Sequence, residues 1–456
     1  MTDDRLLSTL RRLGRQQAGD LASLLQVSRP TLMRMVRAAG ESVLSGGRAR
    51  RTAYAARRSL AGSSAALPVH RIDDAGRLHQ AALLHLAHPD GCRVEYLEQP
   101  AWPLDMDMQD GWFDGLPYFF QDMRPLGFLG RSFARHHAAL LQVDEDPTRW
   151  TDDDVLRALS LLGSDTPGDF IIGQPAARRW LDLASQATPG ITDAAASEEY
   201  PRLADAAMSH GWAGSSAAGE FPKFTAVRRR GKLLQHVLVK FSGSDSSPGT
   251  TRWSDLLVCE HLAATALAKH LDLRAAHSRV LQAGKRSFLE VDRFDRHGPL
   301  GRSGVVSWMA VDAAFFGLAG KGWAEAGRRL AAHGLITSPD ADRLATLWHF
   351  GQLIANTDMH DANLAFEPAL VDGRPGLQLA PVYDMLPMLY APSRGVELAE
   401  RSYAPRLPLP AEERAWHTAA PAALAFWQAA ADEPRISRPF RRTCAANARA
   451  LNALLP

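Results

Sequence analysis

The sequence predicts an α+β fold with two lobes, the first rich in strands and the second helical, preceded by a small helical module. Strand-like patterns at 224–229 and 233–241 come before a long helical stretch at 253–271, and 280–294 returns to strand. Beyond residue 300 the pattern is mostly helical. With 456 residues the chain is too long for one ordinary domain, so we expect two or three.

The composition restricts the class of protein. Hydrophobic residues make up 46% and charged residues 22% of the chain, which is ordinary for a soluble globular protein. No apolar run approaches the roughly 18 residues of a membrane span, and the N-terminus lacks the apolar segment of a secretory signal. Cys92, Cys259 and Cys444 are far apart, which argues against a disulfide framework and a zinc site. We therefore expect a cytoplasmic protein with no membrane partner.

Residues 1–58 are predicted to form a winged helix-turn-helix. Leucines at helical spacing begin at Leu6, Ser28 suits the N-cap of a third helix, and 45–51 has the composition of a basic hairpin tip. This segment carries twelve Lys and Arg against four Asp and Glu, a net charge of +8, while the rest of the chain carries −6. We interpret 1–58 as a domain that binds double-stranded DNA. A helical head that docks a protein is the alternative.

Two sets of side chains would contact DNA on this interpretation. The third helix would reach base edges through Arg29, Thr31, Arg34 and Arg37. The hairpin would neutralise phosphates through Arg48, Arg50 and Arg51. Because helix-turn-helix modules often read palindromes as dimers, the sequence leaves open whether the chain forms a homodimer.

The rest of the chain divides by pattern. Residues 59–67 are small and polar and are interpreted as a linker. We expect a β-rich subdomain at 68–200, a strand-rich lobe at 201–295 and a helical lobe at 296–456.

The strongest chemical motif is Asn356-Thr-Asp358-Met-His360-Asp361-Ala-Asn363, which follows a helical pattern. Asp358 and Asn363 are separated by four residues, the spacing of a protein-kinase catalytic loop, in which Asp orients the hydroxyl nucleophile and Asn holds magnesium. A predicted hairpin then ends at Tyr383-Asp384, where a kinase places a second magnesium ligand. The order of elements and these residues together predict a protein-kinase-like fold with ATP and Mg²⁺ as cofactors.

A kinase also needs a lysine for the nucleotide phosphates. Lys240 lies in a strand-like run between Val239 and Phe241, so its side chain points away from both. Glu260 and Asp255 on the following helix are both candidates for its acidic partner. The chain has neither a G-x-x-x-x-G-K-[ST] motif nor the G-x-G-x-x-G loop.

These motifs resemble those of HipA-type toxin kinases, and the fused N-terminal module resembles the YjjJ-like variant of that family. The order of segments that carries the resemblance is Ser216-Ala-Ala-Gly219-Glu-Phe-Pro-Lys223, Val239-Lys240-Phe241, Val291-Asp292-Arg293-Phe294-Asp295-Arg296, Thr357 to Asn363 and Tyr383-Asp384. The similarity covers roughly 68–456. It implies a HipA-type two-lobed fold and the transfer of the ATP γ-phosphate to a Ser or Thr of a protein substrate.

The resemblance also implies roles for single residues. Asp358 would be the catalytic Asp, Asn363 and Asp384 would hold magnesium, and Lys240 would bind phosphates. The remaining nucleotide contacts would come from Ala218, Gly219 and Lys223 in the phosphate loop, Asp292 and Phe294 at the adenine hinge, and His360. Ser216, or equally Ser215, would be autophosphorylated. The loop departs from the family pattern, because Phe221 replaces Gln and Pro222 replaces an acid.

Two further functions compete with an active toxin kinase. One is a DNA-binding regulator whose kinase body only senses nucleotide, which the altered loop favours. The other is a metal-dependent nuclease built on Asp358, His360 and Asp361.

Overall fold

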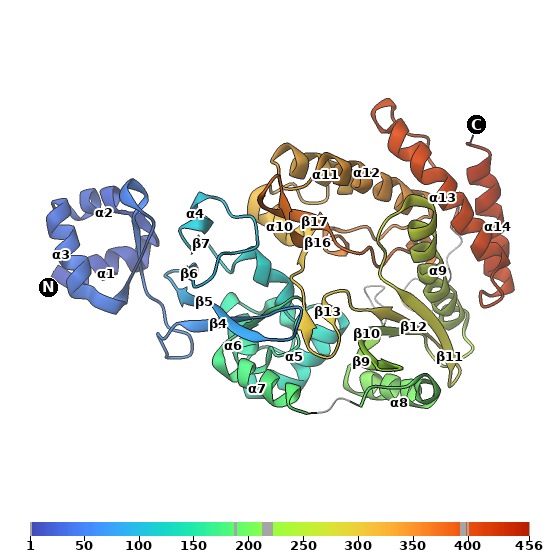
Figure 1. Ribbon diagram of the computed structural model, residues 1–456, viewed down its shortest axis with the longest axis horizontal. Coiled ribbons are helices and arrows are strands. Elements are labelled where there is room, and N and C mark those ends of the chain that lie inside the picture. Colours follow the sequence, from blue (N-terminus) through green and yellow to red (C-terminus); the bar gives the residue numbers. More distant parts are fainter. Residues whose placement is uncertain (1, 187–188, 212–221, 393–397, 399–400, 456) are drawn as a thin grey trace.

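The computed structural model describes residues 2–186, 189–211, 222–392, 398 and 401–455. The parts of the chain follow one another across the molecule, from the N-terminal module at one end to the C-terminal helices at the other (Figure 1).

The N-terminal module folds as three helices and a small sheet. Its elements are α1 (Thr2–Leu13), β1 (Gln16–Gln17), α2 (Ala18–Leu25), α3 (Arg29–Ala39), β2 (Val43–Gly46) and β3 (Ala53–Ala56). The strands pair in the order β1-β3-β2, and leucines from all three helices form the core. Ser28 caps α3 by accepting a hydrogen bond from the Thr31 amide at 3.3 Å. The module thus has three helices followed by the β2–β3 hairpin, and its assignment as a winged helix-turn-helix stays a prediction.

This module packs on the following part of the chain. Arg15 pairs with Asp107 at 2.8 Å, and Arg51 pairs with Asp110 at 3.3 Å. The Arg51 side chain is still 45% exposed, so its expected contact with DNA phosphates stays a prediction.

The middle part is an antiparallel sheet with helices packed against it. Its strands are β4 (Leu67–Ile72), β5 (Leu78–Leu86), β6 (Cys92–Tyr96), β7 (Trp112–Phe113) and β8 (Phe170–Ile172), in the order β7-β6-β5-β4-β8. The helices are α4 (Met106–Gln109), α5 (Gly127–Leu141), α6 (Asp152–Leu162) and α7 (Gln174–Ala184). Apolar residues of the sheet, α5 and α6 belong to the main core.

The next lobe is built on a four-stranded antiparallel sheet. Its elements are α8 (Asp193–Gly211), β9 (Lys223–Arg230), β10 (Leu233–Phe241), α9 (Pro248–Leu271), β11 (Ser278–Ala283) and β12 (Arg286–Asp292), with strand order β11-β12-β10-β9. Tyr200 of α8 donates a hydrogen bond to Glu290 of β12 at 2.5 Å.

Two expectations about this lobe need correction. The run at 280–294 is not one strand, because a turn at Gly284-Lys285 divides it into β11 and β12. The boundary expected between 200 and 201 falls inside α8, which packs on β9 and β11. The structure therefore groups residues 193–200 with this lobe.

The C-terminal lobe is mainly helical. Its helices are α10 (Trp308–Phe315), α11 (Trp323–Ala332), α12 (Ser338–Leu353), α13 (Glu413–Asp432) and α14 (Arg438–Asn452). A small three-stranded sheet contains, in this order, β15 (Val306–Ser307), β16 (Ala365–Val371) and β17 (Arg374–Leu379). A separate two-stranded sheet between the lobes pairs β13 (Arg296–His297) with β14 (Gly301–Arg302). Cys92, Cys259 and Cys444 are buried and free. Within the described ranges, no helix is long and apolar enough to span a membrane.

Candidate active site

The predicted catalytic segment lies in the loop between α12 and β16. Asn356 holds the start of the loop by accepting a hydrogen bond from the Asp358 amide at 3.0 Å. Asn363 closes it, because its side-chain nitrogen donates to the Asp358 carbonyl at 3.0 Å. This bond leaves the amide oxygen of Asn363 as the acceptor available to a cation. The side chain of Asp358 is exposed on this fixed backbone.

Asp384 comes from the segment after β17 and lies beside that loop. Its carbonyl accepts a hydrogen bond from the side chain of Asn356 at 3.3 Å. The hydroxyl of the preceding Tyr383 donates to the Ala362 carbonyl at 3.0 Å. These bonds tie together the two acidic segments that the sequence motifs predicted.

Lys240 reaches the same place from β10. Its ammonium group contacts both carboxylate oxygens of Glu260 on α9, at 2.7 and 2.9 Å, and also bonds to Asp384. The side chains of Lys240 and Glu260 are only 4% and 6% exposed, whereas that of Asp384 is 29% exposed and gives the cluster its access to solvent. Asp255, the other candidate partner, instead accepts bonds from the amide and hydroxyl of Ser437 at 2.6 and 2.7 Å. The structure thus selects Glu260.

The charges of the cluster are unequal, with one cation against two carboxylates. Burial raises the pKa of Glu260 to about 7, and Lys240 opposes that rise only in part. Burial alone would also raise the pKa of Asp384, but the charge of Lys240 outweighs it, so this pKa is lowered. Glu260 is therefore the carboxylate that more readily holds a proton.

The other predicted nucleotide contacts lie around this cluster. Lys223 begins β9 directly opposite Lys240 in the sheet, and its charge lowers the pKa of Asp384. Phe294 stacks on Tyr383, with ring centroids 5.9 Å apart. The Asp292 carboxylate contacts His277 at 3.1 Å and Arg230 at 3.5 Å.

Some predicted residues are not brought into this cluster. The His360 side chain is exposed, and its backbone carbonyl accepts a hydrogen bond from the Asn363 amide. Ser215, Ser216, Ala218 and Gly219 lie outside the described residues.

Sequence reasoning missed an ionic junction between the middle part and the segment 293–296 that follows β12. Asp165 of the middle part pairs with Arg293 at 3.1 Å and with Arg296 at 2.8 Å. Asp295 is buried between the same two arginines. The dense charges at 292–296 were the available signal, but their partner lies more than a hundred positions earlier in the chain.

Known proteins resemble this chain in sequence and in fold. Residues 63–181 match the family model of the YjjJ-like toxin middle domain, and residues 215–450 match that of the HipA-like C-terminal domain. Toxin YjjJ of Escherichia coli (strain K12) is 38% identical over 430 residues, which cover 94% of this chain and 93% of that protein.

Solved structures add a likeness in fold. A chain of the HipA, HipB and operator DNA complex of Shewanella oneidensis MR-1 aligns with a TM-score of 0.53 and 18% identity, covering 85% of this chain and 96% of that one. The Helicobacter pylori proinflammatory kinase CtkA aligns with a TM-score of 0.36 and 13% identity, covering 53% of this chain and 89% of that one.

Proposed function

We propose that this chain, which belongs to the HipA-like toxin family in its YjjJ-like form, is an ATP-dependent kinase that phosphorylates Ser or Thr in a protein. The observation that carries the proposal is the meeting of Lys240, Glu260 and Asp384 beside the loop of Asp358 and Asn363. A buried Lys–Glu pair next to a metal-binding Asp and a catalytic Asp is the set of groups that phosphoryl transfer from ATP requires.

The donor set fits magnesium. Asn363 and Asp384 offer oxygen atoms, which Mg²⁺ prefers, and both residues are held by the same loop. Bound there together with the phosphates, Mg²⁺ would neutralise negative charge on the transferred group. Lys240 would hold phosphate oxygens, and Asp358 would orient the acceptor hydroxyl and receive its proton.

Lys240 has to exchange partners when nucleotide binds. In the described arrangement its ammonium group bonds to both Glu260 and Asp384. Phosphate oxygens would take the place of Asp384 at Lys240, while the retained bond to Glu260 keeps the side chain in position.

Self-modification is the first expected activity. Incubation of phosphate-free protein with Mg-ATP should add phosphate to Ser216 or Ser215, the acceptors implied by the family resemblance. Intact-mass measurement followed by phosphopeptide mapping checks this prediction. Phosphate found only on exposed serines far from residue 216 would contradict the assigned acceptors.

We further propose that the N-terminal module binds double-stranded DNA. Arg29, Arg34 and Arg37 lie exposed on α3, and Arg48 and Arg50 lie exposed at the hairpin. Such a fused module would replace a separate DNA-binding partner. DNA binding by this module is also the observation that would favour the second candidate function, a transcriptional regulator. Two-fold pairing of the module would make a homodimer on a palindromic site.

A gel shift with DNA from the chain's own promoter tests this role. Replacing both Arg34 and Arg37 by Ala should weaken binding about tenfold or more and relax its preference for one DNA sequence. Arg442→Ala removes an exposed arginine of α14 and is the matched control. Equal binding by all three proteins would contradict a role for α3.

The nuclease alternative finds less support. It needs Asp358, His360 and Asp361 around one ion, yet the described residues include no cluster of three His, Cys, Asp or Glu suited to a metal. The Asp361 carboxylate instead accepts a hydrogen bond from the Gly320 amide at 2.9 Å.

A further inference from the structure

A second cavity lies between the middle sheet and the C-terminal lobe, away from Lys240. Its volume is about 480 Å³, which is in the range of small-molecule sites. Residues of β4, β5 and β6 form one wall, and the segments around Trp102, Asp169 and Gly304 complete it. The catalytic residues proposed above do not line it.

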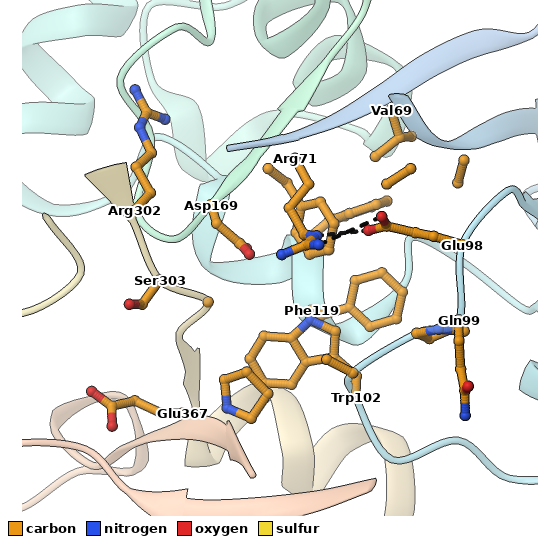
Figure 2. A pocket seen from close by; sticks show the side chains of 18 of the residues that line it. Val69, Arg71, Glu98, Gln99, Trp102, Phe119, Asp169, Arg302, Ser303 and Glu367 are labelled. Carbon is orange, nitrogen blue, oxygen red and sulfur yellow. Dashed lines mark hydrogen bonds and ion pairs between the residues drawn. The ribbon is translucent and has the colours of Figure 1, made fainter. Parts of the chain in front are cut away.

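One carboxylate oxygen in this cavity makes no hydrogen bond with any described residue. Asp169 is only 7% exposed, and its Oδ1 atom makes no hydrogen bond. Figure 2 shows this carboxylate turned into the cavity, with the Trp102 ring on the opposite side. A buried carboxylate oxygen without a partner is costly, so a ligand that supplies a donor would be bound favourably.

Two of the arginines that line the cavity already pair with carboxylates. Arg71 holds Glu98 with contacts of 2.6 and 3.5 Å, and Arg274 pairs with Glu367 at 3.0 Å. Arg302 donates to the Ser164 carbonyl at 2.6 Å through Nη2, while its buried Nη1 atom makes no hydrogen bond among the described residues. Arg71 and Arg274 are therefore ion-paired with other carboxylates, whereas Asp169 forms no ion pair with any residue that the structure describes. Burial, only partly offset by Arg71, raises the pKa of Asp169 to about 7.

The remaining walls are apolar and aromatic. Trp102 stacks on Phe119, with ring planes 6° apart and centroids 6.3 Å apart. Val69, Ala82 and Val94 line the cavity from the sheet. Flat aromatic walls accept a planar group, and aromatic rings attract cations.

We propose that this cavity binds a small planar cation, an amidinium or a protonated aromatic amine, whose N–H groups donate to Asp169. The walls would enclose its ring, and the carboxylate would select its charge. The site is separate from the proposed phosphotransfer site, so this proposal does not depend on the proposed kinase activity.

Three probes of one shape and different charge test the proposal by calorimetric titration of the full chain. Benzamidine carries the cation, benzamide is its neutral counterpart, and benzoate is an anion. We expect one benzamidine per chain, at least tenfold weaker binding of benzamide, and no binding of benzoate. Tighter binding of benzoate than of benzamidine would overturn the assigned charge.

Matched variants locate the binding. Asp169→Asn keeps the shape of the side chain and removes a buried charge, so it should fold and lose at least tenfold in affinity for benzamidine. Asp74→Asn changes an exposed acid at the rim and should keep affinity within about twofold. No benzamidine binding to the wild type, or equal binding to Asp169→Asn, would overturn the proposal.

A steric variant gives a second line of evidence. A Cβ atom at Gly304 would lie 2.8 Å from the Trp102 ring and 3.3 Å from Asp169 Oδ1. Gly304→Ala therefore narrows the cavity beside the carboxylate without changing any charge. It should also lose at least tenfold in affinity while keeping the far-UV spectrum of the wild type, and unchanged affinity would place the probe elsewhere.

Discussion

Lys240→Met is expected to lower the free energy of unfolding by roughly 3–5 kcal/mol, because it leaves the buried Glu260 and the partly exposed Asp384 without their cation. Glu260 and Asp384 both contact the Lys240 ammonium group, which is 4% exposed. The same change should abolish phosphotransfer, since Lys240 is also the proposed phosphate ligand. Urea denaturation followed by tryptophan fluorescence measures the first effect, and an ATP-turnover assay measures the second.

Two further variants separate charge from packing. Adding Glu260→Gln to Lys240→Met removes the buried acid that has lost its cation, so above pH 7, where that acid ionises, stability should recover in part while activity stays absent. Asp255→Asn alters a different buried acid of α9, one that binds Ser437, and should leave the Lys240 cluster and phosphotransfer intact. Wild-type stability in Lys240→Met would contradict the cluster described above.

The raised pKa of Glu260 adds a dependence on pH. A carboxyl with a pKa of about 7 in the folded chain and about 4.3 in the unfolded chain binds more protons when folded. Its contribution to stability is present at low pH and is lost as pH rises from about 4.3 to about 7. The wild type should therefore lose stability relative to Glu260→Gln across this window.

Asp358→Asn is expected to slow phosphotransfer by about 10²–10⁴-fold, because the amide cannot accept the proton of the hydroxyl nucleophile. Affinity for Mg-ATP and stability should change little, since the side chain is exposed and the loop is held by Asn356 and Asn363. Initial rates, and titration with an ATP analogue that cannot be hydrolysed, check the two parts.

A neighbouring acid provides the control for this loop. Asp361 accepts a hydrogen bond from the Gly320 amide, so Asp361→Asn removes a charge three residues away from the proposed base without removing a role in proton transfer. Its rate should stay within a few-fold of the wild type. Equal losses in the two variants would indicate that the loop acts only through its charge.

The local parts of the site could be predicted from the sequence. Asp358 and Asn363 are held by one short loop, and Asp384 follows the hairpin that leaves it, so spacing alone indicated their proximity. Ser28 at the start of α3 was likewise predictable, because a cap depends on residues within one turn.

The choice between Glu260 and Asp255 could not be made in this way. Five positions along an α-helix turn the side chain through about 140°, so only one of the two can face β10. Which one does so depends on the rotation of α9 against the sheet, and that is set by the packing of distant residues. For the same reason, the sequence could not predict that Arg51 pairs with Asp110 or that Asp169 lines a cavity, because both depend on contacts between segments far apart in the chain.

The most direct test of the central claim compares protein-bound label from ATP marked at the γ-phosphate with that from ATP marked at the α-phosphate. With Mg²⁺ and phosphate-free protein, the account predicts stable label on Ser or Thr from γ-marked ATP only, and its loss in Asp358→Asn. Label from the α-phosphate would indicate nucleotide transfer instead. No label from either ATP, or equal γ-label in Asp358→Asn, would contradict the assignment of this site as a kinase centre.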